Sequence, residues 1–290
     1  MKKREPNGQT AADLKIRHLP DLDLTYQRSK EAIWADLSQT IDSFNTNNTP
    51  HSIITLPVTK KWLLLAASIV LLFGATTFMK LYFKEIITDN GQHLTTTLPD
   101  GSKVTLNAGT KIKYHPLWWS FNRELKLSGE AFFTVKKGKQ FDVISSNAKT
   151  SVLGTSFNIY ARHEDYQVTC YSGKVKVTAF ASGNKLYITP NEEARLNKDG
   201  SLRLSKLKDI KAPVAWMNNM FVFTGTPINA VFEEIERQYA VKITTNTKYE
   251  YLYTGNFTRN QPVEQVLKMI CRPYGLKFNK TGDVYLIVKK

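Results

Sequence analysis

The chain has 290 residues, a formal net charge of +15 and two cysteines. The positive charge would suit nucleic acid or an anionic membrane surface, but the lysines are spread along predicted strands and accompany no nucleic-acid-binding motif. We therefore expect no direct binding to nucleic acid. Cys170 and Cys271 form no framework of closely spaced pairs, which excludes a disulfide-stapled domain. We expect two buried free thiols; the alternative is a disulfide between them if this part of the chain is extracytoplasmic.

Residues 1–61 are mostly polar, with one exception. Apolar side chains recur at helical spacing over residues 25–44, which predicts an amphipathic helix with Thr25 or Ser29 as its cap. The tail offers nothing else to bury the apolar face, so we predict a partner-binding helix. The alternative, a helix lying on the membrane surface, is disfavoured by acidic residues on its polar face. The residues predicted to contact the partner are Tyr26, Ile33, Trp34, Leu37 and Ile41.

Residues 62–83 contain a single charged side chain, Lys80, whose ammonium group can reach the membrane interface. Roughly 20 apolar residues in a helix cross the hydrocarbon of a bilayer. A buried helix of a soluble protein would usually carry a polar stripe, and a signal peptide would lie nearer the N-terminus and precede a cleavage site. We therefore predict a permanent transmembrane anchor, followed by a linker at 84–92. Lysines stand on both sides of the span, so the positive-inside rule favours a cytoplasmic N-terminus only weakly.

Residues 93–205 contain short stretches that alternate apolar and polar side chains, the period of half-buried strands. Turn dipeptides such as Asp100-Gly101 and Ser172-Gly173 separate these stretches. The pattern predicts an all-β domain, an antiparallel sandwich, barrel or roll, without a helix of useful length.

Signs of catalysis are weak in this region. The histidines lack metal-ligand spacing, Gly154-Thr155-Ser156 lacks the second glycine of a nucleophile elbow, and no phosphate-cradling loop occurs. A glycan-cleaving enzyme would need two carboxylates in one cleft, but each candidate, including Glu130, is accounted for as an ordinary strand or turn residue. We expect a binding module that is not an enzyme, with no cofactor, metal or small-molecule substrate.

Residues 206–290 contain an internal repeat. Apolar positions of the segment that begins at Pro227 are matched at one fixed spacing by those of the segment that begins at Pro262. In each copy a strand leads to a helix that starts after proline, and a second strand follows. A last strand at 284–288 closes the chain. Two β-α-β units indicate a small α+β domain with two helices on one face of a sheet.

Several runs of the sequence resemble the FecR family of transmembrane anti-sigma regulators. The core runs are TLPDGSKVTLNAGTKIKYHP, ELKLSGEAFFTVKKGKQFDVISSNAKTSVLGTSFNIYA and VTCYSGKVKVT. The runs WMNNMFVFTGTPINAVFEEIERQYAVKI and FTRNQPVEQVLKMICRPYGLKF resemble the C-terminal repeat of the same proteins, which is similar to the short secretin/TonB N-terminal module.

This resemblance implies a single-pass protein of the bacterial inner membrane with a short helical cytoplasmic tail and periplasmic C-terminal domains. The tail would bind an extracytoplasmic-function sigma factor. The periplasmic part would meet the signalling domain of a TonB-dependent outer-membrane transporter, and membrane proteases would cleave the regulator to free the sigma factor. Many members carry a multi-helix domain before the anchor, whereas this tail has one clear helix. Pure inhibition and a sigma-activating role therefore both remain open.

On the periplasmic side we predict that an edge strand of the repeat domain pairs with the transporter's signalling domain. The candidate strands are 221–224 and 284–288, with contact residues Phe221, Phe223, Tyr285 and Ile287. The alternative function is a non-catalytic envelope assembly or structural protein with a secretin-like module.

Overall fold

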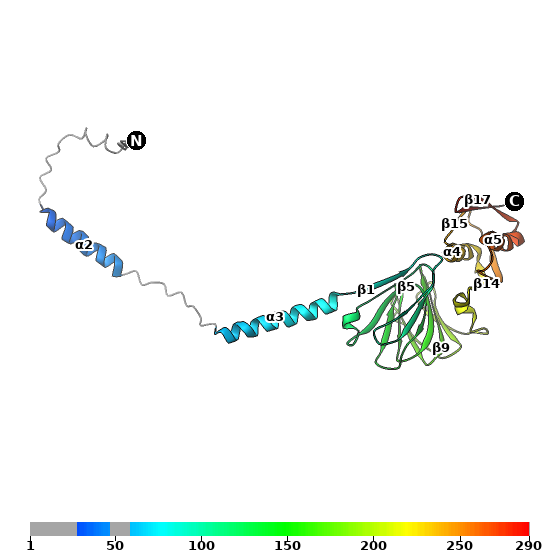
Figure 1. Cartoon of the computed structure of the whole chain (residues 1–290), viewed down its shortest axis with the longest axis horizontal. Helices are drawn as coiled ribbons and strands as arrows, with labels where there is room; N and C mark the ends of the chain where they lie inside the picture. The colour runs from blue at the N-terminus through cyan, green and yellow to red at the C-terminus, as the bar shows by residue number, and fades with distance from the viewer. Residues whose placement is uncertain (1–27, 47–58, 290) are drawn as a thin grey trace, which may run out of the picture. The chain divides into compact units, whose positions relative to one another are not determined.

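The computed structural model describes residues 28–46 and 59–289 (Figure 1). The chain divides between Leu63 and Leu64 into two units, which are described separately. In the first unit, helix α2 (Lys30–Thr46) begins after Ser29, whose Oγ accepts a hydrogen bond from the Ala32 amide at 3.3 Å. Ser29 is therefore the cap. Residues 25–27, where the sequence predicted the helix to start, lie outside the described residues.

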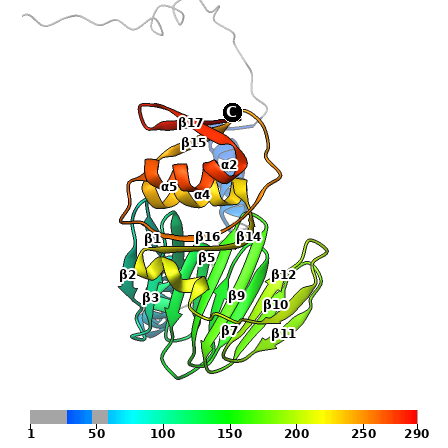
Figure 2. The same cartoon turned by 90° about the vertical axis from the view of Figure 1, so that its right-hand side faces the viewer.

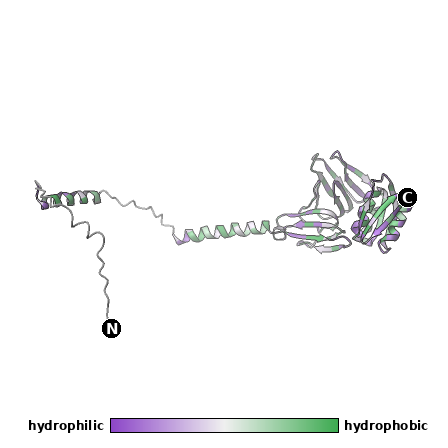
Figure 3. Ribbon diagram, turned by 90° about the horizontal axis from the view of Figure 1, so that it is seen from above, coloured by the Kyte–Doolittle hydropathy of each residue, from purple (hydrophilic) through white to green (hydrophobic). Residues whose placement is uncertain are grey.

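Helix α3 (Lys60–Leu81) has 22 residues, and none of them is buried against the rest of the chain. Figure 3 shows apolar residues on every side of this helix, in contrast to the mixed surface of α2. At 1.5 Å per residue the helix is about 33 Å long, enough to cross the hydrocarbon of a bilayer. Among the described residues it is the one candidate membrane span. Tyr82 and Phe83 lie beyond the helix and connect it to the first strand.

Thirteen strands follow and form one strongly bent, nearly closed sheet, which we call the β domain (Figure 2). They are β1 (Lys84–Thr88), β2 (Leu94–Thr97), β3 (Lys103–Leu106), β4 (Thr110–Tyr114), β5 (Arg123–Thr134), β6 (Phe141–Ile144), β7 (Ala148–Val152), β8 (Ser156–Arg162), β9 (Asp165–Ser172), β10 (Val175–Ala179), β11 (Lys185–Ile188), β12 (Glu192–Leu196) and β13 (Leu202–Lys206). The pairing of β5 with β6 is parallel, and the other pairs are antiparallel.

The long strand β5 joins the two faces of this sheet. Its first half pairs with β4 and β6, and its second half pairs with β3 and β8. The bend lies at Gly129, where φ is +115° and a Cβ would stand 2.6 Å from Thr110 Oγ1. Glycine is needed there because any side chain would collide with β4. The two faces enclose one apolar core, in which the rings of Phe133 and Phe157 stack 4.9 Å apart.

Residues 84–92, expected to be a linker, contain strand β1. It pairs with β4 from Lys84 opposite Tyr114 to Thr88 opposite Thr110. The chain therefore passes from α3 into the sheet through two residues only. The sequence of this strand, KEIIT, does not alternate polar and apolar residues, so sequence periodicity does not identify it.

The C-terminal domain starts with a 3₁₀ segment, η2 (Ala212–Asn218), and contains two helices and five strands. These are β14 (Met220–Pro227), α4 (Ile228–Tyr239), β15 (Lys242–Thr245), β16 (Leu252–Thr258), α5 (Val263–Cys271), β17 (Leu276–Thr281) and β18 (Val284–Lys289). Pro227 and Pro262 stand immediately before α4 and α5, as the repeat predicted.

The strands of this domain form two sheets, so the expectation of a single sheet is wrong. The first strands of the two repeats pair as β14–β16, while the second strands join the last strand in the order β15–β18–β17. Helices α4 and α5 lie between the two sheets (Figure 2), and all three layers share one core. Periodicity identifies the buried face of each strand but not the strand beside it, which is why the sequence left the pairing undetermined.

Cys170 and Cys271 are free and buried. Burial raises the pKa of both thiols to about 11, so neither is a reactive thiolate at neutral pH. The expectation of two buried free thiols is confirmed, and the alternative disulfide between them is not formed.

Candidate functional site

Helix α2 presents an apolar stripe to solvent. Trp34, Leu37 and Ile41 are 62%, 48% and 52% exposed, and Phe44 extends the stripe by one turn. Ile33 is half-buried on the same face, and Tyr26 lies outside the described residues. A single helix with so many exposed large side chains has no core of its own, and such a stripe is typical of a helix that docks into a groove of a partner.

The structure separates the four residues predicted to contact the transporter. Phe221 and Phe223 lie on β14, with parallel rings 6.3 Å apart. Tyr285 and Ile287 lie on β18, where both side chains are fully buried. Since β18 has β15 on one side and β17 on the other, residues 284–288 do not form an edge. That half of the prediction is corrected: β18 cannot accept another strand.

Strand β14 is different. Among the strands that the structure describes, it pairs with β16 alone. All of its residues, Met220–Pro227, line a groove of about 510 Å³ between the C-terminal domain and the β domain. The opposite wall includes Tyr160 of β8 and Glu193 and Arg195 of β12. An unpaired strand edge in a groove of this size is a template for an added strand.

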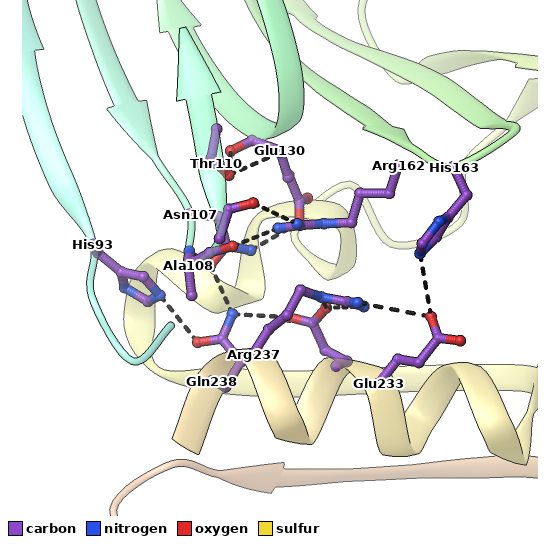
Figure 4. Close-up of polar contacts among 12 residues, drawn as sticks. His93, Asn107, Ala108, Thr110, Glu130, Arg162, His163, Glu233, Arg237 and Gln238 are labelled. Carbon is purple, nitrogen blue, oxygen red and sulfur yellow. Dashed lines mark hydrogen bonds and ion pairs between the residues drawn. The ribbon is translucent and has the colours of Figure 1, made fainter. Parts of the chain in front are cut away.

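Polar side chains hold the two domains together at one end of this groove (Figure 4). Gln238 of α4 donates a hydrogen bond to Asn107 Oδ1 at 2.6 Å, and its Oε1 lies 3.0 Å from His93 Nε2. The Gly91 amide donates to the Arg237 carbonyl at 2.6 Å. The guanidinium of Arg259 donates to the Gly91 carbonyl. We call this set of contacts the domain junction.

Glu130 lies behind Asn107 and is buried, with 7% of its surface exposed. Its carboxylate accepts hydrogen bonds from Asn107 Nδ2 at 2.8 Å and Asn158 Nδ2 at 2.9 Å. Burial raises the pKa of Glu130 to about 7, and the nearby charge of Glu234 adds to this effect, while Arg162 opposes it. A carboxyl group of this kind changes protonation state close to neutral pH.

Two arginines balance the acidic groups of the junction. Arg162 donates to the carbonyls of Gly109 at 2.9 Å and Ala108 at 2.7 Å. Arg237 contacts Glu234 at 2.9 Å. Burial raises the pKa of Glu234, but the charges of Arg237 and Arg162 outweigh burial and leave this pKa below its usual value. The carboxylates at the junction are therefore engaged by protein donors.

Sequence reasoning missed this junction, although Glu130 stands in the run SGEAFF that supports the family resemblance. The residues that surround Glu130 come from the turn after β3, from β8 and from α4, and no local spacing connects them. Among the described residues no group of histidine, cysteine and acidic side chains could hold a metal ion. The arrangement is suited to joining two domains.

Comparisons with known proteins agree with the sequence motifs. A family model described as FecR protein matches residues 84–176, and a second, described as FecR, C-terminal, matches residues 220–287. No curated protein matches the chain. A crystal structure of a candidate anti-sigma factor from Parabacteroides distasonis ATCC 8503 is 31% identical, with a TM-score of 0.66, and covers 72% of this chain and 100% of its own. A second crystal structure with the same description is 31% identical, with a TM-score of 0.65, and covers 71% and 99%.

These matches confirm the predicted family, and with it the expectation of a non-catalytic regulator. The coarse fold class is also confirmed, since one long apolar helix is followed by a nearly closed β domain and a small α+β domain. An anti-sigma factor implies a sigma factor as partner.

Proposed function

The chain belongs to the FecR family of anti-sigma factors, and from this premise we propose that it carries a signal from the periplasm to a sigma factor in the cytoplasm. In this proposal residues 1–61 are cytoplasmic, residues 62–83 cross the inner membrane, and the β domain and the C-terminal domain are periplasmic. The β domain corresponds to the range 93–205 together with β1, and the C-terminal domain to the range 206–290.

The exposed apolar stripe of α2 is the observation that supports sigma-factor binding in the cytoplasm. Trp34, Leu37 and Ile41 would enter a groove of an extracytoplasmic-function sigma factor and bury their apolar surface there. Burial of a large apolar side chain contributes roughly 1.5–3 kcal/mol, so three such side chains offset a substantial part of the free energy that association costs. Ile33 and Tyr26 belong to the same proposed contact set.

The periplasmic half depends on β14. We propose that the signalling domain of a TonB-dependent outer-membrane transporter adds a strand to the free edge of β14, inside the groove between the two domains. Main-chain hydrogen bonds would supply the affinity, and the side chains of Phe223 and the opposite wall would supply specificity. Tyr285 and Ile287 have no part in this contact.

A single helix does not readily transmit a conformational change across a bilayer, because it can tilt or slide without altering a distant tail. We therefore propose that docking at β14 exposes the chain to membrane proteases, and that cleavage releases the tail with its sigma factor. The single membrane span among the described residues supports this step.

The test of the central claim is co-purification of the full chain with sigma factors of its own organism. We expect Trp34→Asp with Leu37→Asp to abolish capture, because two charges would enter an apolar interface. Gln39→Asp is the control, since it adds a negative charge to the opposite, polar face of α2 and should leave capture intact. Unchanged capture by the double variant would overturn the assignment of α2.

A further inference from the structure

The β domain is fixed to the end of α3 by contacts beyond the chain connection. His115 Nδ1 lies 3.1 Å from the carbonyl of Tyr82, and Lys113 Nζ stands 3.5 Å above the ring of Phe83. The loop of residues 115–122 therefore lies directly beside the residues that leave the helix, as Figure 1 shows for its short 3₁₀ segment, η1 (Pro116–Trp118).

This loop presents apolar side chains to solvent. Leu117 is 43% exposed and Phe121 is 70% exposed, and the ring of Trp118 packs 4.7 Å from that of Phe121. The next residue, Trp119, is buried, and its ring packs against Tyr114 and Phe141 at 5.4 and 5.6 Å. Trp119 thus anchors the loop and leaves its neighbours facing outward. Exposed Leu117 and Phe121, with half-buried Trp118 between them, form a contiguous apolar patch, and such a patch marks an interaction surface.

Strand register places further loops at the same end of the β domain. Arg123 is opposite Phe141, and Phe141 is opposite Val152, so the loops of residues 136–140 and 153–155 lie beside residues 115–122. Lys139 Nζ lies 3.5 Å from the Ser120 carbonyl. Buried Arg123 fixes this end, since it donates to the carbonyls of Lys139 at 2.6 Å and Lys136 at 3.1 Å.

These loops add both apolar and positive surface. Leu153 is 64% exposed, and a mostly apolar hollow of about 340 Å³ beside it is lined by Lys137 and Lys174 among others. None of the exposed lysines at this end forms an ion pair with a described residue; they are Lys84, Lys136, Lys137, Lys139 and Lys174. The carboxylates nearby are already engaged. Asp100 and Glu124 accept hydrogen bonds from Arg123 and Asn122, while Glu85 and Asp142 pair with Lys111 and Lys149.

The opposite end of the β domain is occupied. There Asn107 and Glu130 face the C-terminal domain through the junction. Strand β1 runs from one end to the other, because Lys84 lies opposite Tyr114 at the α3 end and Thr88 contacts the Asn107 carbonyl at the junction end. The C-terminal domain therefore lies at the end remote from α3.

We propose that the α3 end of the β domain docks on the surface of an anionic phospholipid bilayer. This inference rests on the proposed membrane-spanning role of α3, whose last residue is separated from β1 by only two residues. Aromatic side chains favour the headgroup level of a bilayer, and lysines around them attract acidic headgroups. Leu117, Trp118 and Phe121 enter the interface, while the lysines lie against lipid phosphates. The docked domain holds its C-terminal domain and the β14 groove away from the bilayer.

The test uses the full chain reconstituted in phosphatidylethanolamine and phosphatidylglycerol nanodiscs. An environment-sensitive fluorophore is attached at Phe121→Cys, and spin-labelled lipids serve as depth-specific quenchers. The native thiols are buried, and labelled wild-type protein gives the background signal. Glu164→Cys, an exposed position at the junction end, is the matched control. Leu71→Cys in α3 reports on the span itself.

We expect shallow quenchers to quench the label at 121, deep quenchers to quench the label at 71, and neither to affect the label at 164. If the label at 71 is quenched but labels at 121 and at Leu117→Cys are not, docking is overturned and α3 is still a membrane anchor. No quenching at 71 shows that α3 does not span the bilayer, so the proposed topology fails together with the inference. If the label at 121 is quenched as strongly in nanodiscs of phosphatidylcholine, which has no net charge, the proposed attraction between the lysines and acidic headgroups is overturned.

Discussion

Gln238 and Asn107 are 131 positions apart in the chain, and their side chains meet at 2.6 Å across the domain junction. Asn107 in turn donates to Glu130, so one row of hydrogen bonds leads from helix α4 into the middle of the β domain. Contacts of this kind are directional, and they fix the angle between two domains more strictly than apolar packing does.

Removal of the Gln238 side chain should loosen this attachment. In Gln238→Ala, Asn107 Oδ1 and His93 lose a partner inside a closed interface, which costs about 1–3 kcal/mol. We expect protease to cut the 207–219 connection faster and the thermal transition to broaden, while the two domain cores survive. Gln265→Ala, at an exposed position of α5, is the control and should behave like the wild type. Identical cleavage rates for the two variants would contradict this role.

The carboxyl group of Glu130 should make stability depend on pH. Its pKa is about 7 in the folded chain and 4.5 in the reference state, so the folded state binds the proton more tightly. Its contribution to stability is therefore complete below about pH 4.5 and is lost as pH rises through about 7.

The measurement is urea unfolding of wild type and Glu130→Gln across this range. The difference in the free energy of unfolding, wild type minus variant, should fall by up to about 3 kcal/mol between the two pH limits. A difference that stays constant with pH would show that Glu130 keeps its charge throughout.

Proline substitutions can separate the two edges of β14. Successive N–H groups of a strand point to opposite edges, so Val222→Pro and Phe223→Pro remove donors on different sides. We expect one variant to lower the melting temperature by breaking a bond to β16, and the other to keep its melting temperature and lose binding to the transporter's signalling domain. Val222→Thr keeps the N–H group and should bind normally. Binding retained by both proline variants would mean that side chains, not the strand edge, make the contact.

Gly129 should be intolerant of any side chain. In Gly129→Ala the new Cβ would meet Thr110 Oγ1 at 2.6 Å and the Thr110 Cα at 2.7 Å, where the backbone cannot move aside. We expect a loss of roughly 2–4 kcal/mol in chemical denaturation, from the clash together with the positive φ. Gly183→Ala, with φ of +68° and no atom within 4 Å, isolates the conformational cost and should lose about 1 kcal/mol.

Local sequence determined much of this protein. The uncharged run of α3, the prolines before α4 and α5, and the alternating strands of the β domain all depend on neighbours within a few residues. Backbone propensity, helix capping and side-chain periodicity act over that range, and each can be evaluated without knowing the fold. The apolar stripe of α2 belongs to the same class.

Tertiary structure decided the contacts between distant segments. It placed β18 at the centre of a sheet, left β14 with a free edge, and brought Glu130 together with Asn107 and Asn158 behind Gln238. It also gathered Phe121, Leu153 and the lysines at one end of the β domain. Strand order and domain contact depend on the summed packing of many weak interactions between residues remote in sequence, and no local pattern encodes that sum.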